Sequence, residues 1–345
     1  MAIKLASFCP IFLFLLLLPI LSTFSLSPNL NSSIANGVVS CGVPPLNKNF
    51  TRFDYLMPDT HRLVGGFESS PHAWPWTGQL VTVWKEANGS ATVTHKCGCA
   101  LIARDFVVTA AHCFAKSRLP SRFLVILGGH EIFNGKNSFC FFNENINPFL
   151  LHVCIYSDQD VFAPAVFAPA HIHPLYQIVH SAYDAALIRI SPVSKFGDNV
   201  WPICLPTLPA SVNRMCVVTG WGRLAEGGKR PQNLREIHVP IMRSTTCNGV
   251  SHYAGRLHYP SMLCAGFNAG KADACQGDSG GPLQCQNAQN IWELQGIVSW
   301  GIGCANPKFP GVYTKTFVIS PWIRAEMFRL KTLYPTPAEE EKGRK

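Results

Sequence analysis

The chain has 345 residues, 47% of them hydrophobic and 14% charged, with a net charge of +9 at pH 7. This length and apolar content suffice for a large buried core, and the chain has no Lys/Arg block suited to a phosphate backbone. We therefore expect no nucleic-acid partner. Fourteen cysteines indicate an oxidising compartment, because such a set would stay reduced in the cytosol.

The chain begins with a short segment carrying one cation, Lys4, followed by the apolar run Phe8 to Leu21. Small residues between Ser22 and Ser27 are suited to cleavage, so residues 1–25 are predicted to be a signal peptide and the protein to be secreted. The alternative is an uncleaved signal anchor, since the apolar run approaches membrane-spanning length. Two prolines in the run and the short charged region favour removal.

Residues 26–62 are rich in Asn, Ser and Pro and show no sustained period, which predicts an irregular pro-segment. Glycosylation sequons begin at Asn31 and Asn49, and a third begins further on at Asn88. In a secreted chain we expect these sequons to be used.

Short β-branched and aromatic runs broken by Gly, Pro and Asn extend from about residue 76 to residue 190, and again from 215 to 314. The clearest runs are Gly78 to Trp84, Phe106 to Thr109, Phe123 to Leu127, Cys216 to Thr219 and Leu294 to Trp300. This pattern predicts an all-β chain with two sheets or barrels.

The end of the chain differs from the part before it. Residues Ser320 to Phe328 are predicted to form a C-terminal helix with Pro321 at its first position. Residues 334–345 are predicted to be a disordered tail, because the segment from Glu339 onward is highly charged.

Three separated segments carry the candidate chemistry: Thr109 to Cys113 with His112, Tyr183 to Ile188 with Asp184, and Asp273 to Pro282 with Ser279. A serine hydroxyl is a weak nucleophile that needs a base, an orienting group and donors for the oxyanion it creates. Alone, the serine segment could be a Gly-rich surface turn. The chain order His, Asp, Ser is that of the chymotrypsin type of triad and argues against this alternative.

With these residues the chain resembles the trypsin/chymotrypsin family of serine endopeptidases, over roughly residues 63 to 330. The resemblance implies that His112 is the general base, Asp184 its orienting group and Ser279 the nucleophile. The N–H groups of Gly277 and Ser279 would form the oxyanion hole. It also implies a fold of two six-stranded antiparallel β-barrels with the triad between them, in a protease domain of residues 63–333, and no cofactor.

The resemblance further implies activation by proteolysis. A trypsin-like protease would cut between Arg62 and Leu63, and the new ammonium of Leu63 would insert and pair with Asp278. A buried carboxylate requires such a partner. Family members more often have Ile at the first position, so Leu63 is a small departure.

Substrate preference can also be carried over from the family. The resemblance places these residues in the substrate pocket: Asp273, Ala274, Ser299, Trp300, Gly301 and Gly311. A carboxylate at the base, Asp273, would select Arg or Lys side chains through charge-assisted pairing. Ala274 stands where some relatives have a serine hydroxyl, which suggests Arg over Lys, because a guanidinium reaches the carboxylate with two donors.

Cysteine pairing does not follow from spacing, but the resemblance implies most of it. The implied disulfides are Cys41–Cys204, Cys97–Cys113, Cys216–Cys285, Cys247–Cys264 and Cys275–Cys304. The first would keep the pro-segment attached after activation. Cys9 would leave with the signal peptide, and the pairing of Cys99, Cys140 and Cys154 stays open.

The chain departs from the family pattern in three places. Cys99 replaces a glycine that follows the Cys-Gly pair at residue 97. The segment Asn134 to Ala170 is longer than family loops there, and either walls the substrate cleft or is a disordered insertion. The stretch Gly128 to Glu131 lacks the first carboxylate of the family's calcium loop, so no calcium or other metal is expected, and His171 and His173 have no nearby ligand partner.

Two classes of function remain open. The first is an active, secreted, Arg-directed endopeptidase that acts on proteins or peptides and meets macromolecular protease inhibitors. The second is a catalytically silent homologue acting as a binding or regulatory module. Silent relatives typically lose a triad residue, and this chain keeps all three, so the enzyme is favoured. A tethered pro-segment resembles cascade enzymes more than digestive ones, but the sequence does not decide between these roles.

Overall fold

The computed structural model describes residues 40–45, 66–85, 91–114, 123–132, 139–140, 154–155, 162–163, 170–190, 192–193, 196–268, 274–304 and 306–335. The predicted signal peptide, most of the pro-segment, the cut between Arg62 and Leu63, and all but the start of the tail lie outside the described residues. So does Asp273. Of the segment from Asn134 to Ala170, three two-residue strands and Ala170 are described.

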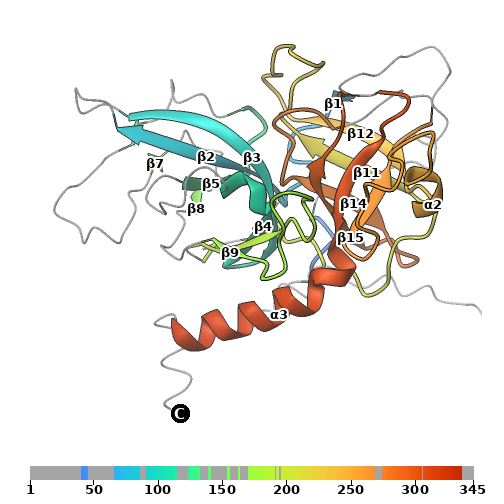
Figure 1. Ribbon diagram of the computed structural model, residues 1–345. Coiled ribbons are helices and arrows are strands. Elements are labelled where there is room, and N and C mark those ends of the chain that lie inside the picture. Colours follow the sequence, from blue (N-terminus) through green and yellow to red (C-terminus); the bar gives the residue numbers. More distant parts are fainter. Residues whose placement is uncertain are drawn as a thin grey trace, which may run out of the picture. The chain divides into compact units, whose positions relative to one another are not determined.

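The strands between residues 77 and 189 form an antiparallel sheet in the order β8-β5-β2-β3-β4-β10-β9 (Figure 1). Its strands are β2 (Thr77–Lys85), β3 (Ala91–Ala103), β4 (Phe106–Thr109), β5 (Phe123–Leu127), β8 (Phe162–Ala163), β9 (His171–Ile172) and β10 (Ala186–Arg189). Every residue of β4 and β5 is buried, which explains why both strands read as continuous apolar runs rather than as alternating ones.

The second half forms an antiparallel sheet in the order β1-β12-β11-β14-β15-β16-β13. Its strands are β1 (Phe67–Glu68), β11 (Met215–Gly220), β12 (Arg235–Pro240), β13 (Met262–Ala265), β14 (Pro282–Gln286), β15 (Trp292–Trp300) and β16 (Gly311–Lys315). An antiparallel bridge between Ile241 and Ala265 joins the end of β12 to β13 and closes this sheet into a barrel.

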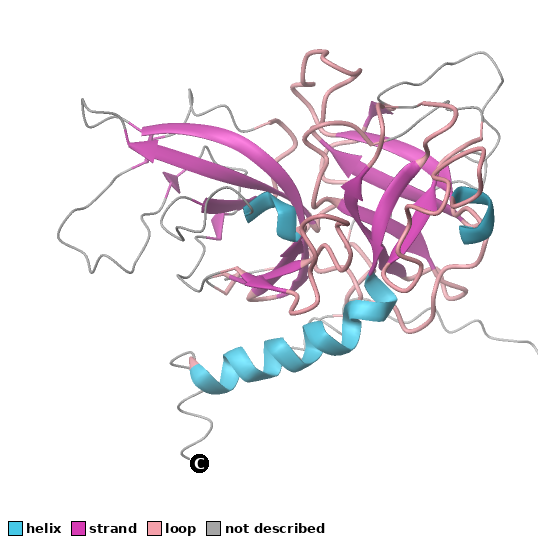
Figure 2. Cartoon of the chain, viewed as in Figure 1, coloured by secondary structure: helices cyan, strands magenta, loops and turns pink. Residues whose placement is uncertain are grey.

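The predicted all-β double-barrel class is confirmed (Figure 2). Each sheet contains seven described strands rather than six, because two-residue strands such as β1 and β8 pair along the edges. Beyond these sheets, β6 (Phe139–Cys140) pairs with β7 (Cys154–Ile155), in a register that sets Cys140 opposite Cys154.

An aromatic and polar contact joins the two barrels. Trp74 and Trp76 precede β2, and Trp74 packs edge-on against Trp292 of β15 with ring centroids 4.8 Å apart. Trp76 Nε1 donates to Gln284 Oε1, and the hydroxyls of Thr77 and Thr219 lie 2.8 Å apart. Buried polar groups need such partners, so these pairs hold one relative placement of the barrels.

Five disulfides brace the described residues, and they are the five that the family resemblance implied. Cys99 is a free thiol on β3, fully buried in the first barrel. Desolvation raises the pKa of Cys99 to about 12, so the thiol behaves as a small apolar side chain.

The C-terminal helix is longer than the sequence predicted, and the expected position of its proline is wrong. Helix α3 spans Thr316–Leu333, so Pro321 lies inside it rather than at its first position. The preceding strand β16 runs directly into the helix, and the buried Ser320 hydroxyl donates to Thr316 O at 2.8 Å. At the other end, buried Arg189 of β10 donates to Leu330 O at 2.8 Å and to Tyr334 O.

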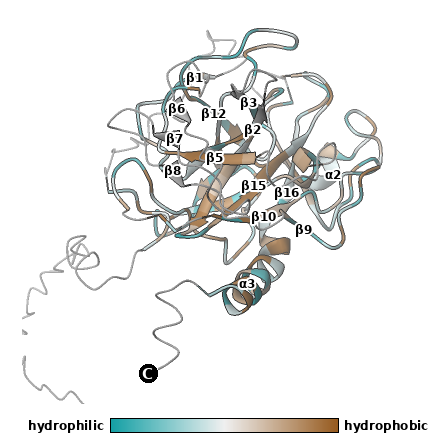
Figure 3. Cartoon of the chain, turned by 90° about the vertical axis from the view of Figure 1, so that its left-hand side faces the viewer, coloured by the Kyte–Doolittle hydropathy of each residue, from teal (hydrophilic) through white to brown (hydrophobic). Residues whose placement is uncertain are grey.

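Helix α3 packs against strands of both barrels, β15 and β10. Figure 3 shows hydrophilic and hydrophobic sides on this helix, whereas β5 is almost uniformly hydrophobic. Among the described helices, none combines the length and the apolar character needed to cross a membrane.

Candidate active site

Strand pairing places His112 beside Asp184. His112 lies in the short 3-10 helix η2 (Ala111–Phe114) that follows β4, and Asp184 lies just before β10. Because β4 and β10 pair with Ala186 opposite Thr109, the two ends meet. His112 Nδ1 lies 2.6 Å from Asp184 Oδ2, and the His112 backbone N–H donates to Asp184 Oδ1 at 2.9 Å.

The second barrel completes the shell around Asp184. The Asp184 residue is fully buried, and a buried carboxylate is stable only when donors replace its water. Ser299 Oγ of β15 donates to Asp184 Oδ2 at 2.6 Å, and Thr314 Oγ1 of β16 donates to the Asp184 carbonyl at 2.8 Å. The carboxylate is therefore held from both barrels.

This carboxylate determines which nitrogen of His112 is available for chemistry. A carboxylate only accepts, so His112 Nδ1 carries the proton and Nε2 of the neutral ring keeps its lone pair. The His112 side chain is 31% exposed, which leaves it accessible from the cleft. The structure shows no hydrogen bond between His112 and the hydroxyl of Ser279. In uncomplexed enzymes such contacts are often long and tighten when substrate binds.

The loop between β13 and β14 presents Ser279. Gly98 N donates to Ser279 O at 2.8 Å, and Gly280 N donates to Val298 O at 2.8 Å, so both barrels hold the backbone of this loop. Gly277 and Gly280 have φ values of +109° and +80°. A Cβ at Gly280 would lie 2.1 Å from Thr109 Oγ1, so this position requires glycine.

The backbone amides of Gly277 and Ser279 have no acceptor among the described residues, and neither does that of Gln276. The neighbouring Asp278, Gly280 and Gly281 amides all donate to backbone carbonyls. Two unpaired N–H groups on either side of one residue form a concave anion site. The two amides that were expected to be oxyanion donors are therefore without an acceptor among the described residues.

His95 of β3 supports the Gly277 carbonyl from the first barrel. Its Nε2 donates to Gly277 O at 3.0 Å, which orients the peptide next to the unpaired amide. Burial lowers the pKa of His95 to about 4, and the positive charge of Arg230 acts in the same direction. The ring is therefore neutral at physiological pH.

A pocket of about 220 Å³ opens beside Ser279. All five described residues that were predicted to bind substrate line it: Ala274, Ser299, Trp300, Gly301 and Gly311. The sixth, Asp273, is outside the described residues but adjoins Ala274. Gln276 and Gly303 also line the pocket.

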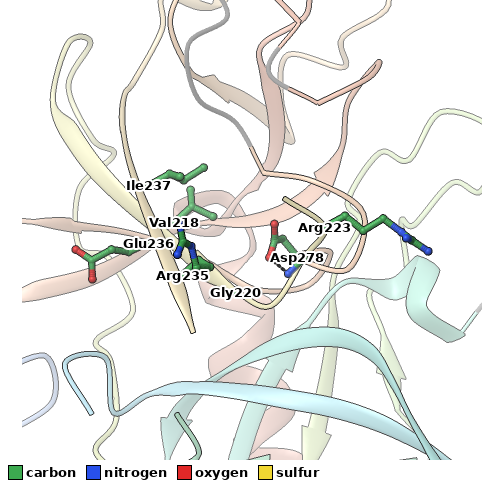
Figure 4. Close-up of a pocket in the computed structure, with 8 residues that line it drawn as sticks. Val218, Gly220, Arg223, Arg235, Glu236, Ile237 and Asp278 are labelled. Carbon is green, nitrogen blue, oxygen red and sulfur yellow. Dashed lines mark hydrogen bonds between the residues drawn. The ribbon is translucent and has the colours of Figure 1, made fainter. Parts of the chain in front are cut away.

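A second, smaller cavity of about 20 Å³ lies next to Asp278 (Figure 4). The Asp278 carboxylate accepts from Gly222 N at 2.7 Å and from Cys275 N at 2.9 Å, and desolvation nevertheless raises its pKa. The Glu236 carboxylate points away from Asp278 in Figure 4 and is bonded to Trp74 Nε1. The cavity has room for about one or two water-sized groups.

The described part of the chain brings together one group of potential metal ligands, Cys97, His112 and Cys113. The two sulfurs form a disulfide and so are not available as thiolate ligands.

The motifs located His112, Asp184, Ser279, Gly277 and Asp278, and the structure brings all five to one region. Sequence reasoning missed Thr314 and His95, which position Asp184 and the serine loop. No local motif marks either residue, because the hydrogen-bond partners of His95 and Thr314 are more than a hundred residues away in the sequence.

Comparisons with known proteins agree with this geometry. The family model described as Trypsin matches residues 63–146 and 158–323. The chain is 35% identical over 286 residues to "Serine proteinase stubble" of Drosophila melanogaster, covering 82% of this chain and 32% of that protein. It is 35% identical over 268 residues to mouse "Transmembrane protease serine 11C", covering 77% of this chain and 54% of that protein.

Human "Transmembrane protease serine 5" is likewise 35% identical, over 269 residues, which cover 77% of this chain and 52% of that protein. This chain thus spans about a third to a half of the length of these relatives.

The double barrel and the matched family model place this chain in one class of protein. The chain belongs to the trypsin family.

Proposed function

We propose that this endopeptidase is made as a secreted zymogen and cleaves peptide bonds after Arg, and less efficiently after Lys, through His112, Asp184 and Ser279. The observation that carries the proposal is the His112–Asp184 pair, together with a serine loop whose Gly277 and Ser279 amides have no acceptor among the described residues. Its disulfides support an extracellular location. The partners are protein or peptide substrates, an activating trypsin-like protease and macromolecular protease inhibitors.

The proposed reaction assigns one role to each of these groups. Ser279 Oγ attacks the scissile carbonyl while His112 Nε2 takes its proton, and Asp184 stabilises the resulting imidazolium. The N–H groups of Gly277 and Ser279 receive the oxyanion. His112 then protonates the leaving amine, and water releases the acyl group by the same steps in reverse order.

The small cavity beside Asp278 supports the activation step. A carboxylate whose pKa is raised by desolvation favours the insertion of a cation, and the room beside it suits an ammonium group. Gly66 packs directly on this region, since a Cβ there would lie 2.1 Å from Glu236 O and 2.3 Å from Ile237 Cγ2. Both of those residues line the cavity. Leu63 precedes Gly66 by three residues, a reach of about 10 Å.

Replacing Arg62 by glutamine is expected to prevent activation. After incubation with immobilised trypsin and its removal, Arg62→Gln should hydrolyse a small Arg ester roughly 10²- to 10³-fold more slowly than the wild type, because the oxyanion donors are not held in place without the Leu63 ammonium. N-terminal sequencing of the treated wild type should begin at Leu63.

Arg52→Gln is the matched control, since it removes a cation from the same segment and should activate normally. Full ester hydrolysis by Arg62→Gln with an intact chain would refute the zymogen proposal.

The disulfide Cys41–Cys204 is expected to keep the cleaved pro-segment on the enzyme. Residues 40–45 pack on the domain, where Gly42 N donates to Pro202 O at 2.8 Å and Trp292 N donates to Gly42 O at 2.9 Å. Mass spectrometry of activated, denatured protein should give one species without reductant and two with it. Cys41→Ser should release the light chain without reductant. A wild-type light chain that separates in denaturant alone would contradict the tether.

A further inference from the structure

A cluster of basic side chains borders the serine loop on the segment between β11 and β12. Residues 222–235 contain Arg223, Lys229, Arg230 and Arg235 against one acid, Glu226. The guanidinium of Arg230 lies directly on Gly277, because a Cβ built on that glycine would be 2.7 Å from Arg230 Nη1. A half-buried cation therefore sits beside the residue that supplies one of the oxyanion donors.

No described carboxylate pairs with this cation. Arg230 Nη1 is buried without a hydrogen-bond partner, and no described acid forms an ion pair with Arg230 or Arg223. Both carboxylate oxygens of Asp278 accept from backbone amides. Glu226 lies elsewhere, with Oε2 3.3 Å from a Cβ built on Gly303.

Arg230 also has a like charge nearby. Burial lowers the pKa of Arg230, and the neighbouring Arg223 guanidinium acts in the same direction. Figure 4 shows the Arg223 side chain extending away from the Asp278 cavity, and its Nη1 donates to Gly228 O. The buried Asp278 carboxylate acts on the pKa of Arg230 in the opposite direction but forms no ion pair with its guanidinium. An incoming carboxylate would relieve the repulsion that remains between the two guanidinium groups.

The position of Arg230 identifies the part of the substrate it would meet. The residue before the scissile bond places its side chain in the pocket lined by Ala274, Ser299 and Gly301. The leaving amine must lie on the other side of Ser279, where His112 can protonate it. Arg230 contacts Gly277 but does not line that pocket, so we assign it to the leaving-group side.

We propose that Arg230, together with Arg223, binds an acidic side chain of the substrate on the leaving-group side, within the first three residues after the scissile bond. Substrates with Asp or Glu there would be cleaved faster than otherwise identical substrates. The inference rests on the proposed cleavage after Arg and adds a second recognition site to it.

The test uses internally quenched peptides with one Arg, an amidated C-terminus and Glu, Gln or Lys at each of the three following positions. With trypsin-activated wild type, kcat/KM at one of these positions should be about five- to tenfold higher for Glu than for Gln, as a charge-assisted pair at a half-buried site allows. Raising the salt concentration should shrink this ratio.

Arg230→Gln should abolish the Glu preference, and Lys229→Gln should retain it as the matched control, since Lys229 is an exposed cation of the same segment. A small Arg ester has no residue after the scissile bond, so Arg230→Gln should lose more kcat/KM on the Glu peptide than on the ester, and Lys229→Gln should lose on neither.

Three outcomes would overturn the proposal: no Glu preference in the wild type, a preference that survives Arg230→Gln, or an equal loss of ester and peptide hydrolysis in Arg230→Gln. The last would mean that Arg230 supports the serine loop instead. Failure of the activated wild type to hydrolyse any Arg ester would instead count against the proposed function.

Discussion

Ser279→Ala is expected to lower kcat for peptide hydrolysis by roughly 10⁴- to 10⁶-fold, the range seen when a member of a serine-protease triad is removed. The hydroxyl is the proposed nucleophile, and alanine has no oxygen that could form the acyl intermediate in its place. The remaining rate would come from the oxyanion donors and from substrate binding.

The same substitution should leave the fold intact. The loop is held through its backbone, by the bonds from Gly98 N to Ser279 O and from Gly280 N to Val298 O, and not through the Ser279 side chain. The melting temperature of Ser279→Ala should therefore match the wild-type value within about 2 °C.

The measurement is steady-state kinetics on an Arg peptide after activation, with active-site titration of the wild type. Ser211→Ala, at an exposed position before β11, is the matched control and should retain full activity. If Ser279→Ala kept a substantial part of the wild-type rate, Ser279 could not be the nucleophile. If instead the activated wild type were inactive, the chain would have to be considered a catalytically silent binding module.

Asp273→Ser is expected to lower kcat/KM for Arg substrates by about three orders of magnitude, a loss on the order of 4 kcal/mol. Asp273 adjoins Ala274, which lines the pocket beside Ser279. A guanidinium buried in this pocket without a carboxylate would lose its charge-assisted hydrogen bonds, at a cost of several kcal/mol. The loss should therefore fall on cationic substrates.

Activated esters with apolar side chains provide the comparison, because they use the same triad and oxyanion donors but need no carboxylate in the pocket. Their hydrolysis by Asp273→Ser should fall much less than that of Arg esters. Asp198→Ser removes an exposed acid and should change neither rate. Equal losses on both ester types would show that Asp273 holds the loop together rather than binding the substrate.

Local sequence patterns were sufficient to predict several of the strands. The predicted runs Phe106 to Thr109 and Phe123 to Leu127 coincide with β4 and β5, because fully buried strands read as unbroken apolar stretches between turn residues. The predicted start of the C-terminal helix was wrong because it, too, was taken from a local pattern. Pro321 is a local signal for a first turn, but tertiary packing continues β16 directly into α3 and places the helix start at Thr316.

By itself, the sequence determined the proposed catalytic residues: a histidine, an aspartate and a serine in a characteristic order, with glycines where the serine loop has positive φ. Only the tertiary structure decided what surrounds them. Ser299 and Thr314 hold Asp184, the cavity lies beside Asp278, and Arg230 lies on Gly277. The contacts of Ser299 and Thr314 with Asp184 exist only because the two barrels pack in one orientation. The cavity and the Arg230 contact form within the second barrel, where distant strands pair, and no local pattern encodes either arrangement.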